Sequence, residues 1–346
     1  TKKGGKGSLA EFVSDDLKNW TDNGVFMTMM WDRFYECPDL FKMGDYWYLV
    51  YSEIHHAIRR VQYFKGRTLD ELKACTANDA GRWPDAHEGF LDSRGLYAGK
   101  TASDGTNRYL WGWCPTRSGK DNTAVGASPA EPEWGGNLVC YKLIQHEDGT
   151  LTLGQVDAVS EKYNQDVAVE VKDQKGMSVV ERKDAEGNLI RNEKGEVLKD
   201  TILSGDNAYM LLGRLGNHNK ISFTVTTSNE WDKFGISMVR GSDSKKYYTM
   251  VVNPEPEKEN IRKVNFEEQG VEGKGFIAGI DGYEFARPAD NVYNITIYTD
   301  NSICVMYIND VCSYTNRIYG IQKNCWSIDS FNGASVKVSN LKISQY

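Results

Sequence analysis

Short runs in which apolar and polar residues alternate recur along the chain from residue 9 to about residue 158. Each run has five to seven residues, is rich in aromatic and β-branched side chains, and is bounded by Gly, Asp or Asn. This pattern predicts β-strands, because successive side chains of a strand point to opposite faces. The runs are LAEFVS (9–14), YWYLVYS (46–52), RRVQYFK (59–65), RYLWGWC (108–114) and NLVCYKL (137–143).

The segments between these runs contain turn signals, such as the pairs Asp104-Gly105 and Asp148-Gly149. Strands joined by such turns pair as antiparallel hairpins, and a repeat of about four strands is typical of a propeller blade. Helix signals are nearly absent, and TLDELKA at 68–74 is the one short candidate. We therefore expect this part of the chain to form β-propeller blades.

A change in composition divides the chain near residue 160. A polar stretch covers 159–176, and a charged stretch punctuated by Gly covers 181–200, which we expect to be an exposed, hairpin-like insertion. From residue 201 onward short alternating runs return, and seven or more of them favour a β-sandwich. The sequence thus predicts an all-β protein with two domains, at 1–160 and 161–346.

Composition and charge exclude several classes of protein. The 346 residues suit two domains, and no apolar run approaches the roughly 18 residues of a membrane-spanning helix. The formal charge of −7, with Lys and Arg dispersed along the chain, leaves no basic surface for nucleic acid. The seven cysteines include no CxxC pair, so we expect no zinc site and at most one or two disulfides, for which the last three cysteines are candidates. No glycine-rich phosphate-binding pattern occurs either, and we expect no cofactor.

The first eight residues, TKKGGKGS, are polar and contain no initiator Met. A cytoplasmic protein would start in this way, but so would a mature or truncated chain whose export signal lies further upstream. We expect the second case, and therefore a secreted, periplasmic or cell-surface protein.

The segment ECPDLF at 36–41 holds the most informative carboxylate of the chain, Glu36. Pro38 fixes its own φ and removes a backbone donor, which places Glu36 at a strand start or in a loop. Aromatic residues make up 12% of the chain and surround this segment, and their flat rings suit the binding of sugars. On its own the segment is a carboxylate in an aromatic neighbourhood, and any surface Glu beside a Pro would look similar.

The segment ECPDLF resembles the acid/base motif of glycoside hydrolase family 32, the invertases, inulinases and levanases. Further segments resemble, in order and spacing, the family's Ser-x-Asp-Leu-x-x-Trp strand, its YA run, its GW strand and its closing blade. They are SDDLKNW (14–20), LDSRGLYAGKT (91–101), RYLWGWC (108–114) and WGGNLVCYKLIQHEDGTLT (134–152).

The resemblance continues into the last third of the chain. The segment VYNITIYTDNSICVMYINDVCSYTNRIY at 292–319 is similar to the family's C-terminal sandwich, from whose polar pattern Asn301 and Met306 depart. The resemblance thus covers nearly the whole chain. It implies part of a five-bladed β-propeller followed by a C-terminal β-sandwich.

The resemblance also implies a chemistry, the retaining hydrolysis of β-fructosidic bonds in sucrose or fructans without a metal or cofactor. Glu36 would act as general acid on the glycosidic oxygen and then as general base on the attacking water. Trp113 would line the fructose pocket, Tyr97 would lie near the catalytic centre, and Cys37 would lie beside the acid/base. The alternative for each aromatic residue is packing inside a blade, and the alternative for Cys37 is a buried thiol.

Departures from the family pattern matter as much as the matches. The family's W-M-N-D-P-N-G motif, whose Asp is the nucleophile, and its R-D-P motif occur nowhere in the sequence. Trp31-Asp32-Arg33 reverses the second motif and lies too close to Glu36 to replace it. The resemblance therefore implies that about two of the five blades are missing and belong to the same gene or to a second chain, and we expect the isolated chain to be inactive. Asp16, Asp32 and Asp39 are conceivable substitute nucleophiles, but each also fits a turn or a salt bridge.

Two other functions remain open. One is a carbohydrate-binding or structural protein that keeps the scaffold without catalysis. The other is an enzyme of the related arabinan- or xylan-cleaving propeller families, which the combination of ECPDLF with an appended sandwich disfavours.

Two further groups of polar residues are weaker candidates. His55 and His56 beside Glu53 do not suit a metal, because neighbouring side chains of a strand point to opposite faces, and a polar loop rim is the better interpretation. The second group fits a subsite rim and a solvated turn equally well, and consists of Asp85, His87, Glu88 and Asp92.

Overall fold

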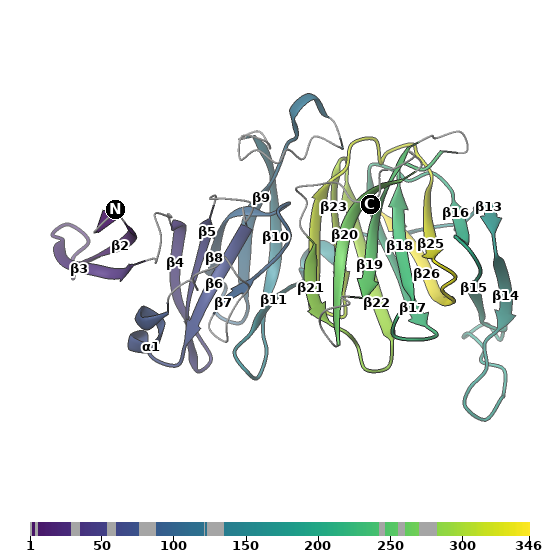
Figure 1. Ribbon diagram of the computed structural model, residues 1–346, viewed down its shortest axis with the longest axis horizontal. Helices are drawn as coiled ribbons and strands as arrows, with labels where there is room; N and C mark the ends of the chain where they lie inside the picture. Colours follow the sequence, from purple (N-terminus) through teal and green to yellow (C-terminus); the bar gives the residue numbers. More distant parts are fainter. Residues whose placement is uncertain are drawn as a thin grey trace. The chain divides into compact units, whose positions relative to one another are not determined.

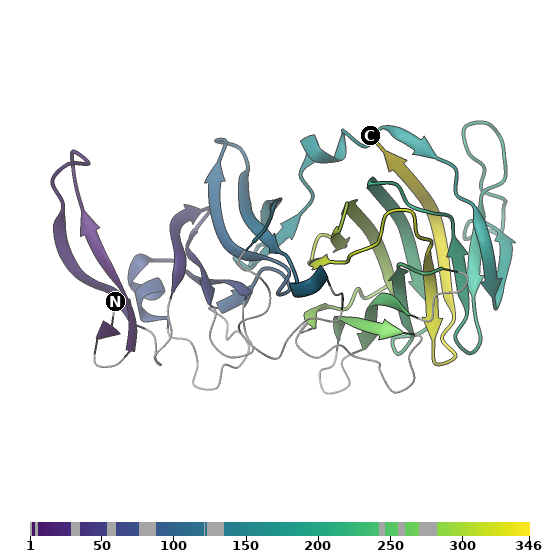
Figure 2. The ribbon, with the colours of Figure 1, turned by 90° about the horizontal axis from the view of Figure 1, so that it is seen from above.

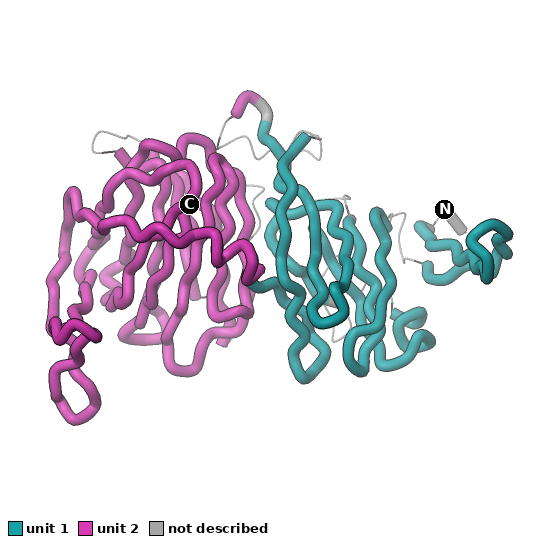
Figure 3. Tube along the Cα trace, turned by 180° about the vertical axis from the view of Figure 1, so that it is seen from behind, with its two compact units in different colours: residues 1–118, 126–154 teal, residues 119–125, 155–346 magenta. Residues whose placement is uncertain are grey.

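The computed structural model describes residues 2–3, 6–28, 35–53, 60–75, 88–120, 122, 135–241, 246–254, 260–269 and 282–346. Over these residues the chain is nearly all β-structure, as predicted, and it divides into two compact units (Figures 1 and 3). Unit 1 comprises residues 1–118 and 126–154, and unit 2 comprises residues 119–125 and 155–346. No helix within the described ranges is long and apolar enough to cross a membrane.

Unit 1 contains three antiparallel sheets whose strands pair with their neighbours in sequence (Figure 1). Such meanders are propeller blades, so the prediction of a partial propeller is confirmed. The first sheet has β1 (Lys2–Lys3), β2 (Lys6–Val13) and β3 (Thr21–Thr28); the second has β4 (Glu36–Met43), β5 (Tyr46–Glu53), β6 (Arg60–Gly66) and β7 (Glu88–Phe90); the third has β8 (Tyr97–Ser103), β9 (Arg108–Pro115), β10 (Gly136–Gln145) and β11 (Leu151–Gly154).

The second sheet is covered on both faces. On one face Leu49 and Tyr51 of β5 join a buried apolar cluster that includes Leu72 of the helix α1 (Leu69–Ala74). This helix is the one that the sequence predicts, and Thr68 caps it by accepting a hydrogen bond from the Glu71 N–H.

On the other face the second sheet packs against the third through hydrogen bonds as well as apolar contacts. The Tyr48 hydroxyl donates to the Gly149 carbonyl at 2.7 Å. The Tyr63 hydroxyl accepts from the Leu151 N–H at 3.0 Å. Buried tyrosines with bonded hydroxyls therefore fix how one blade lies on the next.

Residues 14–20, which the resemblance aligns with a strand, form the turn between β2 and β3 instead. The Asp16 carboxylate accepts hydrogen bonds from the backbone N–H groups of Lys18 and Asn19 at 2.8 and 2.7 Å. A short acceptor side chain that satisfies nearby backbone donors favours a turn over a strand ladder. The same N–H groups, that of Asn19 first, hold the pKa of Asp16 well below its usual range. Asp16 therefore has the turn role that the sequence offered as its alternative.

Unit 2 is a β-sandwich of two antiparallel sheets (Figure 2), as predicted. The first sheet consists of β14 (Met177–Glu181), β15 (Lys199–Leu203), β26 (Val336–Gln345), β17 (His218–Thr227), β22 (Val292–Asp300), β23 (Ile303–Ile308) and β24 (Cys312–Arg317), with β12 (Gln165–Val167) also paired to β26. The second consists of β13 (Val171–Lys175), β16 (Tyr209–Leu212), β25 (Trp326–Phe331), β18 (Lys233–Met238), β19 (Tyr247–Pro254), β20 (Ile261–Gln269) and β21 (Tyr283–Ala286).

The two sheets of the sandwich meet through large buried rings. Phe223 of the first sheet lies 6.5 Å from Trp326 of the second, measured between ring centroids. Phe234 and Tyr293 make an edge contact at 5.2 Å across the same interior. Alternation along β17, where every second residue is buried, supplies this core.

Residues 159–176 contain more structure than their polar composition indicates. They include β12, β13 and, just before them, the short helix α2 (Asp157–Ser160). The side chains of β13 are all exposed, so apolar alternation, the main sequence signal for a strand, is missing there. Residues 182–198, between β14 and β15, carry two small bridged loops, Lys183 with Leu189 and Arg191 with Val197.

All seven cysteines lie in the described residues and all are free, so the structure forms fewer disulfides than the one or two that the sequence allowed. Cys304 and Cys312 lie on adjacent strands, β23 and β24, yet they are not opposite each other. Cys304 is paired with Asn316 and Cys312 with Ile308. The strand register therefore separates the two thiols.

Candidate active site

Three of the predicted site residues come together where the second and third sheets of unit 1 begin. Glu36 is the first residue of β4, Tyr97 is the first of β8, and Trp113 lies on β9. The Tyr97 hydroxyl donates a hydrogen bond to Oε2 of Glu36. Trp113 is the cross-strand partner of Tyr97, and the two rings meet edge to face at 6.2 Å. Residues far apart in sequence thus form one cluster of a carboxylate and two aromatic rings.

A β-bulge on β4 directs the Glu36 side chain. Glu36 pairs with Ser52 and Asp39 with Val50, so three steps along β4 match two steps along β5. The additional residue is accommodated at Cys37, whose φ is +50°, a value uncommon for residues with a Cβ atom. Pro38 has no N–H to donate to a neighbouring strand, which favours the break in the ladder at this point.

Strand β8 of the third sheet carries a bulge of the same kind. Tyr97 pairs with Trp113 and Lys100 with Trp111, and Ala98 has a φ of +54°. Gly112 lies between the two tryptophans, where an added Cβ would be 2.8 Å from the Tyr97 carbonyl oxygen. The absence of a side chain at Gly112 therefore lets β9 approach Tyr97 closely.

Asp39 fastens the two bulged strands together. Its Oδ2 accepts hydrogen bonds from the Thr101 N–H at 2.6 Å and from the Thr101 hydroxyl at 2.7 Å. Lys100 Nζ donates to the Pro38 carbonyl at 2.7 Å. Asp39 is therefore engaged in positioning β4 on β8. The sequence offered Asp39 as a substitute nucleophile or as a turn or salt-bridge residue, and did not predict its bonds to Thr101.

Cys37 is exposed, which removes the alternative of a buried thiol. Partial desolvation raises the pKa of its thiol above the usual value, the Glu36 carboxylate raises it further, and Lys100 opposes both. The thiol stays protonated at neutral pH, and a protonated thiol is a poor nucleophile. Its contribution at this place is a small, weakly polar surface next to Glu36.

The weaker candidates divide between described and undescribed residues. Asp92 is 1% exposed and accepts a hydrogen bond from the Ser93 N–H at 2.5 Å, so it is not part of a solvated turn. Within the described ranges no three His, Cys, Asp or Glu side chains are placed to hold a metal ion. Of the other predicted candidates, those that lie outside the described residues are Asp32, His55, His56, Asp85 and His87.

The cluster contains chemical groups that a general acid/base site for a sugar would need. A carboxyl group can donate and later recover a proton, and a hydrogen bond from Tyr97 fixes which oxygen is available. The half-buried indole of Trp113 offers an apolar ring face of the kind that packs against the C–H groups of a sugar. Hydrolysis of a glycosidic bond by general acid/base catalysis also needs a second carboxylate, which lies about 5 to 9.5 Å from the first depending on the mechanism.

Two family models match the chain. The model described as the glycosyl hydrolases family 32 N-terminal domain matches residues 1–155. The model described as the GH32, BT1760-like, C-terminal domain matches residues 149–343. No curated protein matches the chain in sequence.

Solved structures with a similar fold have low sequence identity to the chain. Sucrose-6-phosphate hydrolase from Lactobacillus gasseri is 16% identical with a TM-score of 0.59, and the match covers 98% of this chain and 60% of that one. The β-fructofuranosidase of Bombyx mori is 15% identical with a TM-score of 0.58, and the match covers 98% of this chain and 61% of that one. The exo-inulinase of Aspergillus awamori is 14% identical with a TM-score of 0.59, and the match covers 97% of this chain and 61% of that one. The chain thus spans about three fifths of the length of these proteins.

Proposed function

This chain belongs to glycoside hydrolase family 32, and on that basis we propose that it takes part in the hydrolysis of β-fructosidic bonds in sucrose or fructans. The observation that carries the proposal is the hydrogen bond between Tyr97 and Glu36, beside the ring of Trp113. This contact joins the three segments that resemble the family's acid/base, YA and GW motifs.

In the proposed mechanism Glu36 protonates the glycosidic oxygen as the bond breaks and then removes a proton from the attacking water. Retention requires a second carboxylate that attacks the anomeric carbon, about 5 to 5.5 Å from Glu36. The family's motif for this nucleophile, W-M-N-D-P-N-G, is not in the sequence. We propose that further propeller blades, encoded by the same gene or carried by a second chain, supply it.

The proposed role of Trp113 predicts weaker sugar binding when the ring is removed. Trp113→Ala is expected to weaken fructose or fructan binding by roughly 2- to 12-fold, since an aromatic face contributes about 0.5 to 1.5 kcal/mol beyond area burial. Isothermal titration calorimetry on the folded variant measures the change. Trp231→Ala is the matched control, because Trp231 is 63% exposed and lies in unit 2. Unchanged affinity in a folded Trp113→Ala protein would assign the ring to packing between strands.

The proposed function is tested with the complete protein, including the blades that this chain lacks relative to its family. Incubation with sucrose, inulin and levan is expected to release fructose, while arabinan and xylan stay intact. Hydrolysis of arabinan or xylan instead of fructans would contradict the proposal.

The missing nucleophile motif favours one other function, a carbohydrate-binding protein without catalysis. The same incubation separates the two, because such a protein would bind a fructan in calorimetry and release no fructose. Binding without turnover in the complete protein would therefore replace hydrolysis with recognition as its function.

A further inference from the structure

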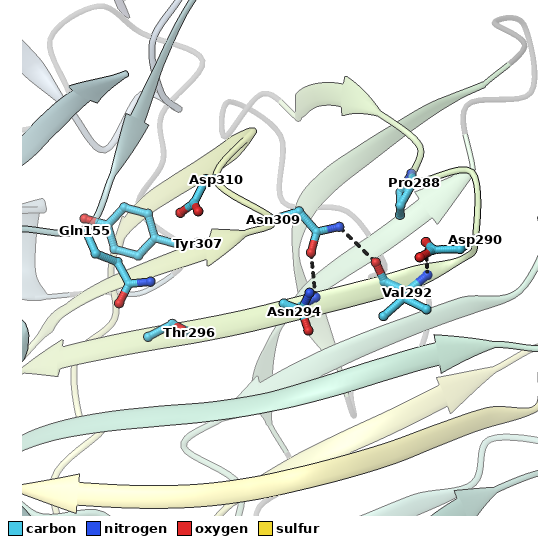
Figure 4. Close-up of a pocket in the computed structure, with 9 residues that line it drawn as sticks. All are labelled: Gln155, Pro288, Asp290, Val292, Asn294, Thr296, Tyr307, Asn309 and Asp310. Atoms are coloured by element: carbon cyan, nitrogen blue, oxygen red, sulfur yellow. Dashed lines mark hydrogen bonds between the residues drawn. The ribbon is translucent and has the colours of Figure 1, made fainter. Parts of the chain in front are cut away.

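The sandwich carries an open pocket of about 440 Å³, whose lining residues all belong to unit 2 (Figure 4). It lies over β22, the segment before β22 and the turn between β23 and β24, and Gln155 closes one side. We propose that this pocket binds a neutral saccharide as a second, non-catalytic site. That the saccharide is a fructan rests on the proposed function.

Strand alternation places the polar floor of the pocket. Asn294 and Thr296 line it, and they alternate along β22 with Tyr293, Ile295 and Ile297, which are buried in the core. Because the apolar partners are held in the sandwich interior, the amide and the hydroxyl must point outward. Figure 4 shows both side chains on the pocket side of the strand.

One wall of the pocket is fixed in place by hydrogen bonds. Asn309 Nδ2 donates to the Val292 carbonyl at 2.9 Å, and its Oδ1 accepts from the Asn294 N–H at 2.7 Å. Asp290 Oδ1 accepts from the Val292 N–H at 3.0 Å (Figure 4). These bonds tie the turn after β23 and the segment before β22 to the start of β22. A ligand would therefore meet a preformed wall, which lowers the ordering cost of binding.

Two amide groups present donors to the pocket. The Gln155 Oε1 accepts from the Tyr298 hydroxyl at 2.8 Å, which leaves Nε2 as the end offered to a ligand. The Asn294 Oδ1 accepts a hydrogen bond from the Thr224 hydroxyl at 3.0 Å, which leaves Nδ2 of Asn294 as the end offered to a ligand. Each amide is thus oriented by a neighbour outside the pocket lining.

The charges and donors of the lining select the class of ligand. The described lining contains two carboxylates, Asp290 and Asp310, and no Lys, Arg or His, which disfavours phosphates and other anions. The amide donors of Gln155 and Asn294 disfavour a bare metal cation, which needs oxygen ligands. A sugar hydroxyl donates to a carboxylate and accepts from an amide, so it uses both kinds of group. Tyr307 also lines the pocket but is buried, so the polar side chains carry the recognition of the ligand.

The test uses calorimetric titration of the full chain in a Trp113→Ala background, which reduces binding at the proposed catalytic site. Inulin and levan oligosaccharides, oligosaccharides of other neutral sugars and CaCl₂ are titrated separately. Gln155→Ala and Asn294→Ala are each expected to weaken saccharide binding by roughly 2- to 12-fold, the worth of one lost hydrogen bond, and the double variant by more. Asn188→Ala, an exposed amide between β14 and β15, is the matched control and should bind as the parent does.

Thermal unfolding shows whether each variant is folded. If the alanine variants do not fold, Asn294→Asp replaces them in the titration, because it keeps the size of the side chain and removes its donor. Binding of a saccharide other than a fructan, weakened by these substitutions, supports the pocket and leaves the proposed function to its own test. Three results would overturn the inference. The first is that no saccharide binds in the Trp113→Ala background, and the second is that these substitutions leave saccharide binding unchanged. The third is that the pocket binds Ca²⁺ and no saccharide.

Discussion

Replacing Glu36 by Gln in the complete protein is expected to lower kcat on fructans by about 10²- to 10⁴-fold while substrate binding stays nearly the same. The amide keeps the size and shape of the carboxyl group but cannot deliver a proton to the leaving oxygen. Its carbonyl oxygen can still accept the hydrogen bond that Tyr97 donates to Glu36 Oε2. The local structure is therefore retained, and the loss reports on the chemistry.

Initial rates of fructose release and calorimetric binding to the Gln variant measure the two quantities separately. Glu186→Gln is the matched control, because Glu186 is exposed in the segment between β14 and β15, far along the chain from β4. Tyr97→Phe, which removes the hydrogen bond and leaves the carboxylate, is expected to have a smaller effect than Glu36→Gln. Turnover at the parent rate in the Gln variant would exclude Glu36 as the acid/base.

Many of the strands and the one predicted helix follow from local pattern. Alternation identified β5, β6, β9 and β10 to within one or two residues, because each has a regular strand of apolar and aromatic residues. The helix at Leu69–Ala74 follows from a capping Thr68 before a run of good helix formers. The resemblance, and not local pattern, singled out Glu36, Tyr97 and Trp113, which the fold then brings together.

Features that depend on contacts between distant strands were not predictable from the sequence. The bulges at Cys37 and Ala98 are visible only in the register of each strand against its partner. The hydrogen bonds from Thr101 to Asp39 join residues 62 positions apart, in different sheets. Local pattern can show that a strand exists, but tertiary packing decides which residues its side chains contact.

Apolar side chains on the first sheet of unit 1 point to a further contact. Phe12, Leu17 and Trp20, on and between β2 and β3, are 53%, 78% and 55% exposed. Large apolar side chains that are exposed to water are unfavourable and can mark a surface that another chain segment covers. This observation supports the proposal that further blades complete the propeller.

The 346-residue chain, purified alone, is expected to release no fructose from sucrose, inulin or levan. A retaining mechanism needs a nucleophilic carboxylate as well as the acid/base, and the two described substitutes are already engaged. Asp16 is bonded to the backbone of its own turn, and Asp39 is bonded to Thr101. Asp32, the third substitute, lies outside the described residues.

Adding a separately produced polypeptide that carries the W-M-N-D-P-N-G motif and the blades around it is expected to restore fructose release, because it supplies the nucleophile and covers the exposed face of β2 and β3. The control is the same polypeptide with the motif's Asp replaced by Ala, which should bind the chain without restoring activity. Release by the chain alone that Glu36→Gln abolishes would contradict the expectation, since it would place a working nucleophile within these 346 residues. Asp32→Asn would then be the first variant to measure, because the other two substitutes, Asp16 and Asp39, are hydrogen-bonded elsewhere.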